Sequence, residues 1–311
     1  MDVRRTYIGI VLVSALVVAF ESVSIEGALN IAEIDIFLVS SLPSVIGGAL
    51  LLAAFPAKTG ELIKGLGRRG WSGMFVVCAI VAAGVFMWFD AVGRIGASKE
   101  AILGGGSSEV LFVVILSAVF LGERLRRWEA VGSVLIIVGV FLVLANADSL
   151  SFGIGFGEVE AIASSLLLAM SIVMITALLR THDLTALSGL ELLMSGSMLV
   201  VFAGALGMIR LPDLGGMLAL LGLGAFPAVG LWTYNAGLPK IGASLTSVLF
   251  ALNGIITVGV QLLVLAVFPD AEIQLPKVLA LALLGGAVAF IGVYLLNRKQ
   301  VDASATIEKR R

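Results

Sequence analysis

The feature that most constrains this chain is a series of ten apolar runs along its 311 residues. Each run holds about 20 residues, which as a helix rising about 1.5 Å per residue crosses the roughly 30 Å hydrocarbon core of a bilayer. The sequence therefore predicts an all-α membrane protein with ten transmembrane helices. The expected spans are residues 6–26, 36–55, 71–92, 97–121, 128–145, 157–179, 186–209, 214–238, 243–268 and 278–296.

Composition excludes several classes of protein. Hydrophobic residues make up 59% of the chain and charged residues 13%, against about 45–50% and about 25% in soluble domains. The 20 Lys and Arg residues balance 21 Asp and Glu residues, so a basic surface for nucleic acid is not expected. The single Cys78 and the single His182 cannot build a disulfide or a zinc site alone. We therefore expect no metal, no other cofactor and no nucleic-acid partner.

Basic residues in the short loops predict the orientation, because Lys and Arg resist translocation. With a cytoplasmic amino terminus, sixteen of the 20 basic residues fall on the inner side. The four on the outer side are Arg94, Lys99, Arg210 and Lys277. The pattern predicts a multi-pass protein of the cell (inner) membrane with both termini in the cytoplasm.

Two short segments recur at compatible spacings and indicate a duplication. The sequence GRIGAS at 93–98 returns as PKIGAS at 239–244, and IVGVFL at 137–142 returns as FIGVYL at 290–295. Five expected spans in each half force the second half to enter the membrane from the opposite side. We expect inverted repeats at 1–146 and 153–297, followed by a cytoplasmic tail at 298–311 that is disordered from Lys299.

These features resemble the EamA-type members of the drug/metabolite transporter superfamily. The resemblance rests on the ten spans, the duplication, the Gly-Ala-Ser motif that opens the fourth and ninth spans, and Leu-Gly-Glu-Arg at 121–124. The second half departs from that last motif at 267–272. The resemblance implies a transporter of small organic solutes, and it alone favours export.

Glu109 is the leading candidate for a functional residue. A charged side chain at mid-helix costs about 2.5–3.5 kcal/mol on insertion scales and tends to mark a function. Glu109 lies at the middle of the fourth expected span, after Gly104, Gly105 and Gly106, which are expected to bend the helix. It either lines a transport cavity, with proton coupling as a hypothesis, or makes structural hydrogen bonds.

Three further acids lie inside expected spans. Asp90 and Glu21 occupy the outer halves of the third and first spans, and Glu191 lies about two turns into the seventh. Each either lines the cavity or is neutralised for structural reasons. For Asp90 the structural alternative is an ion pair with Lys99.

Aromatic and amide side chains complete the candidate set. Trp88, Trp232 and Tyr234 occupy the third and eighth spans, which correspond in the duplication. Their rings either hold an organic cation or flat solute or anchor the helices at the membrane interface. Asn253 either lines the cavity or hydrogen-bonds between helices.

The combined interpretation is a secondary active transporter for small organic metabolites such as amino acids or amines, working by alternating access. The acids in the first half favour a cationic solute, membrane lipids surround the protein, and protons are a candidate coupling ion. No catalytic residue is expected, and the chain is not predicted to be an enzyme. The alternatives are a membrane-embedded enzyme that acts on a lipid or amphiphile, and a sensor or scaffold that transports nothing.

Overall fold

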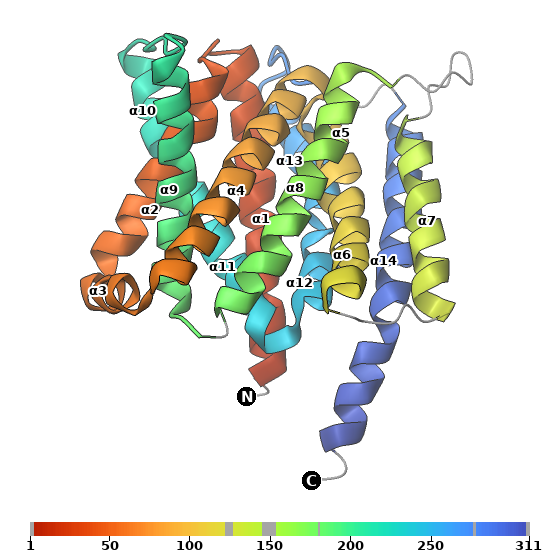
Figure 1. The fold of residues 1–311 in the computed structure, drawn as a ribbon. Coiled ribbons are helices and arrows are strands. Elements are labelled where there is room, and N and C mark those ends of the chain that lie inside the picture. Colours follow the sequence, from red (N-terminus) through yellow and green to blue (C-terminus); the bar gives the residue numbers. More distant parts are fainter. Residues whose placement is uncertain (1–2, 122–126, 145–153, 180, 276–277, 309–311) are drawn as a thin grey trace.

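The computed structural model describes residues 3–121, 127–144, 154–179, 181–275 and 278–308. All regular structure in these segments is helical, and the long helices pack side by side in one bundle (Figure 1). The elements are α1 (Val3–Asn30), α2 (Ile36–Ala54), α3 (Pro56–Gly65), α4 (Arg68–Ile95), α5 (Ala97–Leu103), the π-helix η1 (Gly104–Ser108), α6 (Glu109–Leu121), α7 (Arg127–Leu144), α8 (Phe156–Leu179), α9 (Leu184–Ala205), α10 (Leu214–Leu223), α11 (Ala225–Ile241), α12 (Ala243–Phe250), α13 (Asn253–Val267) and α14 (Leu279–Glu308).

The prediction of a helical membrane protein is confirmed. Within the described segments, seven helical stretches are long and apolar enough to cross a bilayer. Two shorter apolar helices, Ala130–Val143 and Leu279–Leu295, coincide with the expected fifth and tenth spans. The expected fourth span is divided among α5, η1 and α6. The count of ten therefore stays a prediction.

The fourth and ninth expected spans are both interrupted near their middle, and the two interruptions meet. The π-helix lies at the glycine run where a bend was expected, and the Ser107 hydroxyl donates to the Ile102 carbonyl at 2.5 Å. The second interruption separates α12 from α13. A Cβ on Gly254 would lie 3.1 Å from the Ala101 carbonyl oxygen, and one on Gly106 would lie 3.3 Å from the Ala251 carbonyl oxygen. A side chain at either glycine would therefore press on the backbone of the other broken helix.

The recurring Gly-Ala-Ser motif has the same backbone conformation in both halves. Gly96, which joins α4 to α5, has φ 83° and ψ 152°, and Gly242, which joins α11 to α12, has φ 89° and ψ 152°. Side-chain-bearing residues rarely adopt these angles, so glycine is the residue that both turns need. Each turn reverses the chain so that a new helix returns into the bundle.

Glycine also sets the approach of α7 to α14. A Cβ on Gly139 would lie 2.5 Å from the carbonyl oxygen of Gly285, and one on Gly292 would lie 2.5 Å from that of Gly132. Backbones this close are typical of small-residue contacts between membrane helices. These glycines therefore serve the packing of the two helices.

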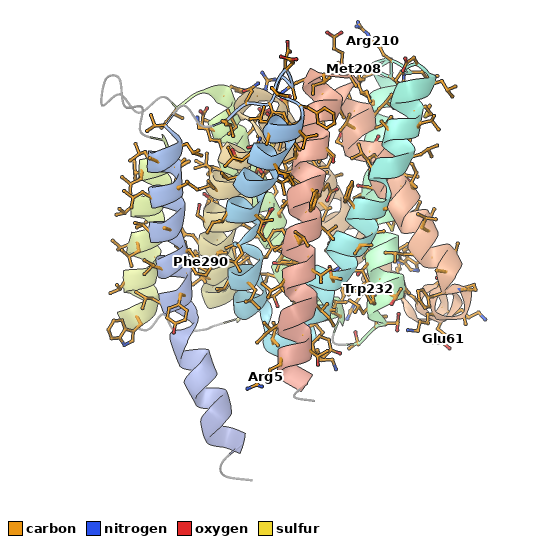
Figure 2. The ribbon with its side chains drawn as sticks, turned by 180° about the vertical axis from the view of Figure 1, so that it is seen from behind. Arg5, Glu61, Met208, Arg210, Trp232 and Phe290 are labelled. Atoms are coloured by element: carbon orange, nitrogen blue, oxygen red, sulfur yellow. The ribbon has the colours of Figure 1, made fainter. Side chains whose placement is uncertain are left out.

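The structure adds one helix outside the expected spans, and the expectation of a disordered tail is wrong. The loop after the second span holds the helix α3, whose Lys58 pairs with Asp183 at 3.0 Å. The tail expected to be disordered from Lys299 continues α14 as a helix to Glu308. The start of α1 and the end of α14 lie at the same end of the bundle (Figure 1). Arg5 and Arg210 lie at opposite ends of it (Figure 2). Residues 122–126, which carry most of the Leu-Gly-Glu-Arg motif, lie outside the described residues.

Candidate functional site

A cavity of about 140 Å³ lies at the centre of the bundle. Eight helices from both halves of the chain line it, and most of the lining side chains are apolar or aromatic. The lining residues are Val18, Glu21, Ser44, Val81, Val85, Trp88, Phe89, Glu109, Leu168, Ser171, Ile172, Ile175, Glu191, Leu192, Pro227, Leu231, Tyr234, Asn235 and Phe250. A mostly apolar space with a few convergent polar groups is the usual form of a small-molecule site.

Glu109 enters this cavity because the π-helix ends directly before it. Its side chain is 4% exposed and accepts a hydrogen bond from the Tyr234 hydroxyl. That hydroxyl also lies 2.9 Å from the Ser247 hydroxyl, and the Tyr234 ring packs edge-on against Phe250 with centroids 5.1 Å apart. Residues of α6, α11 and α12 therefore form one pole of the cavity around the Glu109 carboxyl.

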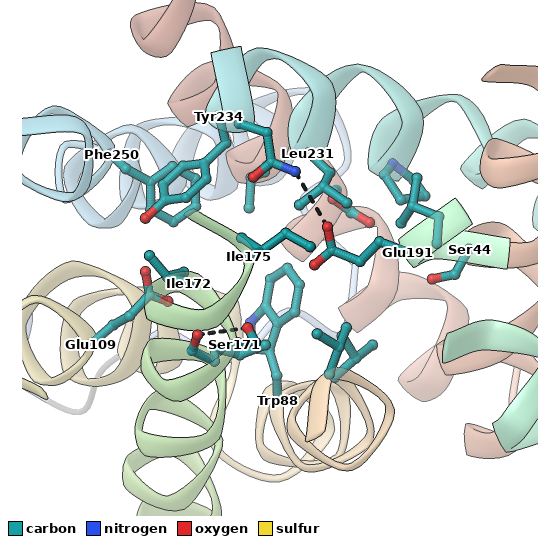
Figure 3. A pocket seen from close by; sticks show the side chains of 18 of the residues that line it. Ser44, Trp88, Glu109, Ser171, Ile172, Ile175, Glu191, Leu231, Tyr234 and Phe250 are labelled. Carbon is teal, nitrogen blue, oxygen red and sulfur yellow. Dashed lines mark hydrogen bonds between the residues drawn. The ribbon is translucent and has the colours of Figure 1, made fainter. Parts of the chain in front are cut away.

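Glu191 forms a second pole from the other half of the chain. Its carboxyl accepts a hydrogen bond from Asn235 Nδ2 at 3.3 Å, and the same amide donates to the Ser188 hydroxyl at 3.0 Å. Asn235 follows Tyr234 on α11, so this helix supplies one hydrogen-bonding side chain to each pole. Figure 3 shows Glu109 and Glu191 across the cavity from each other, with Ile175 between them.

Glu21 is the third carboxyl group of the cavity. It is 4% exposed, and its position on α1 brings it beside Gly230 of α11, where a Cβ would lie 4.0 Å from Oε2. Within the part of the chain that the structure describes, its carboxyl has no hydrogen-bond or ion-pair partner. A buried polar group without a partner is costly, so this carboxyl is available to a bound group.

Trp88 forms part of the wall between the two poles (Figure 3). Its ring packs edge-on against Phe89, with centroids 4.9 Å apart, and its indole Nε1 donates to Glu100 at 2.7 Å. Glu100 is 2% exposed and does not itself line the cavity. The indole is thereby fixed by a partner behind the wall.

Five of the eight candidate residues from the sequence meet at this cavity, namely Glu21, Trp88, Glu109, Glu191 and Tyr234. The other three lie elsewhere. Asp90 pairs with Arg94 at 2.8 Å, and not with Lys99, whose ammonium group contacts Glu158. The alternative of an ion pair between Asp90 and Lys99 is therefore wrong. Asp90 pairs with Arg94 because residues four apart on a helix face each other.

The remaining two candidates also have partners outside the lining. Trp232 is 36% exposed and donates its indole N–H to the Thr185 hydroxyl at 3.1 Å. Asn253 is buried at the start of α13 and accepts from the Thr257 hydroxyl at 3.0 Å. Thr257 lies on the same helix, so this bond does not join two helices, and Asn253 is not among the described residues that line the cavity.

Asn235 is the polar residue of the cavity that sequence reasoning missed. An amide within an apolar span, next to a selected tyrosine, was a usable signal. Phe250 and Ser44 also line the cavity without having been selected, and neither residue type stands out in a sequence rich in apolar and small residues. Their placement depends on tertiary packing.

The charges of the cavity are all of one sign. Of its described lining residues, three are Glu and none is Lys, Arg or His. Across the described segments, no group of three His, Cys, Asp or Glu side chains is arranged to hold a metal ion. The arrangement suits an organic cation, which carboxylates attract electrostatically and aromatic faces attract through their quadrupole.

Part of the chain matches the model of a known protein family. Residues 5–145 match the model of the EamA-like transporter family, which lies within the drug/metabolite transporter superfamily. The resemblance stated from the sequence is confirmed over these residues, and members of the family are transporters, not enzymes. No curated protein matches the chain.

A solved structure shares the fold. A protein described only as a crystal structure matches with a TM-score of 0.62 and 20% sequence identity, covering 93% of this chain and 98% of its own. At this identity the likeness shows the fold alone, and it extends over both halves of the bundle.

Proposed function

We propose that the whole chain is a secondary active transporter exporting small organic metabolites that carry an amino group, because residues 5–145 match the model of the EamA-like transporter family. One observation carries the proposal. A central cavity places three carboxyl groups and aromatic rings from both halves of the chain around a common space. A solute held there contacts both halves, as a carrier requires.

The two halves, 1–146 and 153–297, are proposed to be inverted five-helix repeats that rock about the cavity. Three features support this arrangement: the matched turns at Gly96 and Gly242, the paired interruptions of the fourth and ninth spans, and the placement of both termini at one end. Alternating access follows when such halves exchange conformations around a site near the membrane midplane. We further propose an inner-membrane location with cytoplasmic termini, which follows from the distribution of Lys and Arg.

Proton coupling through Glu109 completes the proposed mechanism. A carboxyl group that binds an ammonium group releases that cation when it takes up a proton, so inward proton movement can drive outward movement of the solute. The groups that face Glu109 are the Tyr234 hydroxyl, which donates to it, and the Glu100 carboxyl, which repels its charge. Neither supplies a positive charge that would replace the solute.

Reconstitution tests this function. The purified chain is first screened by thermal shift against amino acids, amines and organic anions, because a ligand that binds the folded form raises Tm. The stabilising solute is then followed into sealed proteoliposomes. Saturable, time-dependent uptake of an amine or amino acid supports the carrier. Binding without uptake points to a sensor, and unsaturable conductance points to a channel. Either of those two results would overturn the proposal.

A further inference from the structure

The cavity provides no positive charge for an anionic group of a solute. Glu21, Glu109 and Glu191 line it, and the described lining residues include no Lys, Arg or His. An amino acid bound there would place its own carboxylate among three others without a counter-charge. Like charges in a water-poor space repel strongly, because the interior screens charge far less than water. The site therefore favours a solute with positive charge alone.

The unpartnered carboxyl of Glu21 is an independent sign that a cation belongs in this space. Glu21 is only 4% exposed and lines the cavity, and no described residue pairs with its carboxyl group. Carboxyl groups within the membrane usually pair with a protein group or serve a bound ion or solute. A bound cation supplies the missing counter-charge.

The two remaining carboxyls occupy separate poles with apolar surface between them. Tyr234 holds the Glu109 carboxyl, and Asn235 holds the Glu191 carboxyl. Ile175 and Trp88 lie between the poles in the view of Figure 3. This arrangement, with a carboxyl group at each pole and an apolar wall between them, complements a molecule that has an ammonium group at each end and a hydrocarbon chain between.

We propose that the cavity binds a linear α,ω-diamine, with one ammonium group at Glu109, the other at Glu191, and the methylene chain against Ile172, Ile175 and Trp88. This inference rests on the proposed function and narrows its substrate class. Each ammonium group gains a charge-assisted hydrogen bond, and the chain gains apolar contact. The single negative charge of Glu21 adds to the field that favours a doubly charged solute.

Three four-carbon probes of matched length test the proposal on the purified full-length protein. They are 1,4-diaminobutane, with two ammonium groups; butylamine, with one; and 4-aminobutanoate, with one ammonium group and one carboxylate. Equilibrium binding of each radiolabelled probe is measured. Because a hydrogen bond to a charged group contributes about 1.5–3 kcal/mol, we expect the diamine to bind at least about tenfold more tightly than butylamine. The aminobutanoate is expected to bind most weakly.

Variants of Glu109 and Glu191 test whether these two residues cause the preference for the diamine over butylamine. Glu109→Gln and Glu191→Gln are each expected to bring the Kd for the diamine close to that for butylamine, whereas Glu109→Asp retains the preference. Glu61→Gln, at an exposed glutamate of α3, is the matched control and is expected to leave all three values unchanged. A series of diamines with three to six carbons is expected to show an optimum length, because the poles are fixed.

The outcomes separate this inference from the proposed function. Equal binding of butylamine and the diamine, tighter binding of the aminobutanoate, or no binding of any diamine to the folded protein overturns the diamine assignment. Saturable transport of another amine would then leave the proposed function intact. Tight diamine binding with no transport of any solute would instead support the assignment and overturn the transporter.

Discussion

The indole Nε1 of Trp88 lies 2.7 Å from Oε2 of Glu100, and the pair joins the wall of the cavity to a carboxyl group buried behind it. The two residues lie on consecutive helices, α4 and α5, which meet at the sharp turn of Gly96. A Cβ on Gly104 would lie 2.2 Å from Glu100 Oε1, so the first glycine of the π-helix makes room for this carboxyl. The interruption of the fourth span thus supports the cavity from behind.

The first prediction concerns this pair. Glu100→Ala leaves the buried indole N–H of Trp88 without an acceptor, which costs about 1–3 kcal/mol. Glu100→Gln keeps an acceptor oxygen and is expected to stay near the wild-type stability. Thermal unfolding of both variants checks this. Equal destabilisation by the two substitutions would show that the charge of Glu100, and not its hydrogen bond to Trp88, matters.

A second prediction concerns Glu26, a fully buried carboxyl group that connects elements far apart in the sequence. It accepts from the backbone N–H of Ala97 at 3.1 Å, from Gln261 Nε2 at 2.5 Å and from the backbone N–H of Gln274 at 2.5 Å. Glu26→Ala leaves three donors without this acceptor, two of them buried, and we expect a loss of at least about 2 kcal/mol of unfolding free energy. Denaturant unfolding measures it, with the exposed Glu272→Ala as the control. A loss no larger than that of the control would show that the hydrogen bonds of Glu26 do not stabilise the fold.

A third prediction concerns pH and the ion pair between Lys58 and Asp183 outside the spans. Burial raises the pKa of Asp183, but hydrogen bonds from Lys58 and from the backbone N–H groups of Ala186 and Thr185 outweigh it, so the folded pKa lies below its ordinary value of 3.8. A lowered folded pKa means that the stabilisation is complete above the unfolded pKa and is lost as the pH falls through the folded pKa.

The variants for this pair are Lys58→Met and Asp183→Ala. The side chains are 46% and 34% exposed, so solvent screening limits the effect of Lys58→Met to less than about 1 kcal/mol at pH 7. Asp183→Ala also removes the N-cap of α9 and is expected to cost about 0.5–2 kcal/mol. Both losses are expected to shrink below about pH 4. The free energy of unfolding of both variants is measured from pH 7 to below pH 4. Losses that stay constant over this range would contradict a stabilising role for the ionised Asp183 carboxyl.

A fourth prediction concerns the contact between α7 and α14. Gly139→Ala places a methyl group 2.5 Å from the carbonyl oxygen of Gly285, which forces the helices apart. Overpacking of this kind typically costs about 1–3 kcal/mol. Gly73→Ala on α4 is the matched control, because a Cβ there meets nothing within 4 Å. Comparable Tm values for the two variants would show that the close approach is not needed.

The sequence predicted those features that depend on local composition. Span length and hydropathy located the membrane helices, and the glycine run at 104–106 located the interruption before Glu109. The short polar helix α3 has no apolar periodicity to reveal it. The helical tail beyond Lys299 has a composition that suits a disordered segment equally well.

The candidate site was predictable only in part, because a buried charge does not reveal its partner. Glu109, Glu191 and Glu21 were identifiable as charges inside apolar spans, and all three line the cavity. Asp90 carries the same sequence signal, but a salt bridge four residues along its own helix neutralises it. The bond between Glu26 and Gln261 joins residues 235 positions apart, and only the tertiary fold brings such residues together.

Solute counterflow in sealed proteoliposomes tests the central claim most directly, because only a carrier with a site exposed alternately to the two sides exchanges one solute molecule for another. Vesicles loaded with unlabelled 1,4-diaminobutane or butylamine are diluted into the labelled solute at equal pH inside and outside. We expect transient accumulation with the wild type and with Glu61→Gln, and reduced accumulation of 1,4-diaminobutane with Glu109→Gln. Absence of accumulation with the wild type for either amine and for each common amino acid, or undiminished accumulation with Glu109→Gln, would contradict this claim.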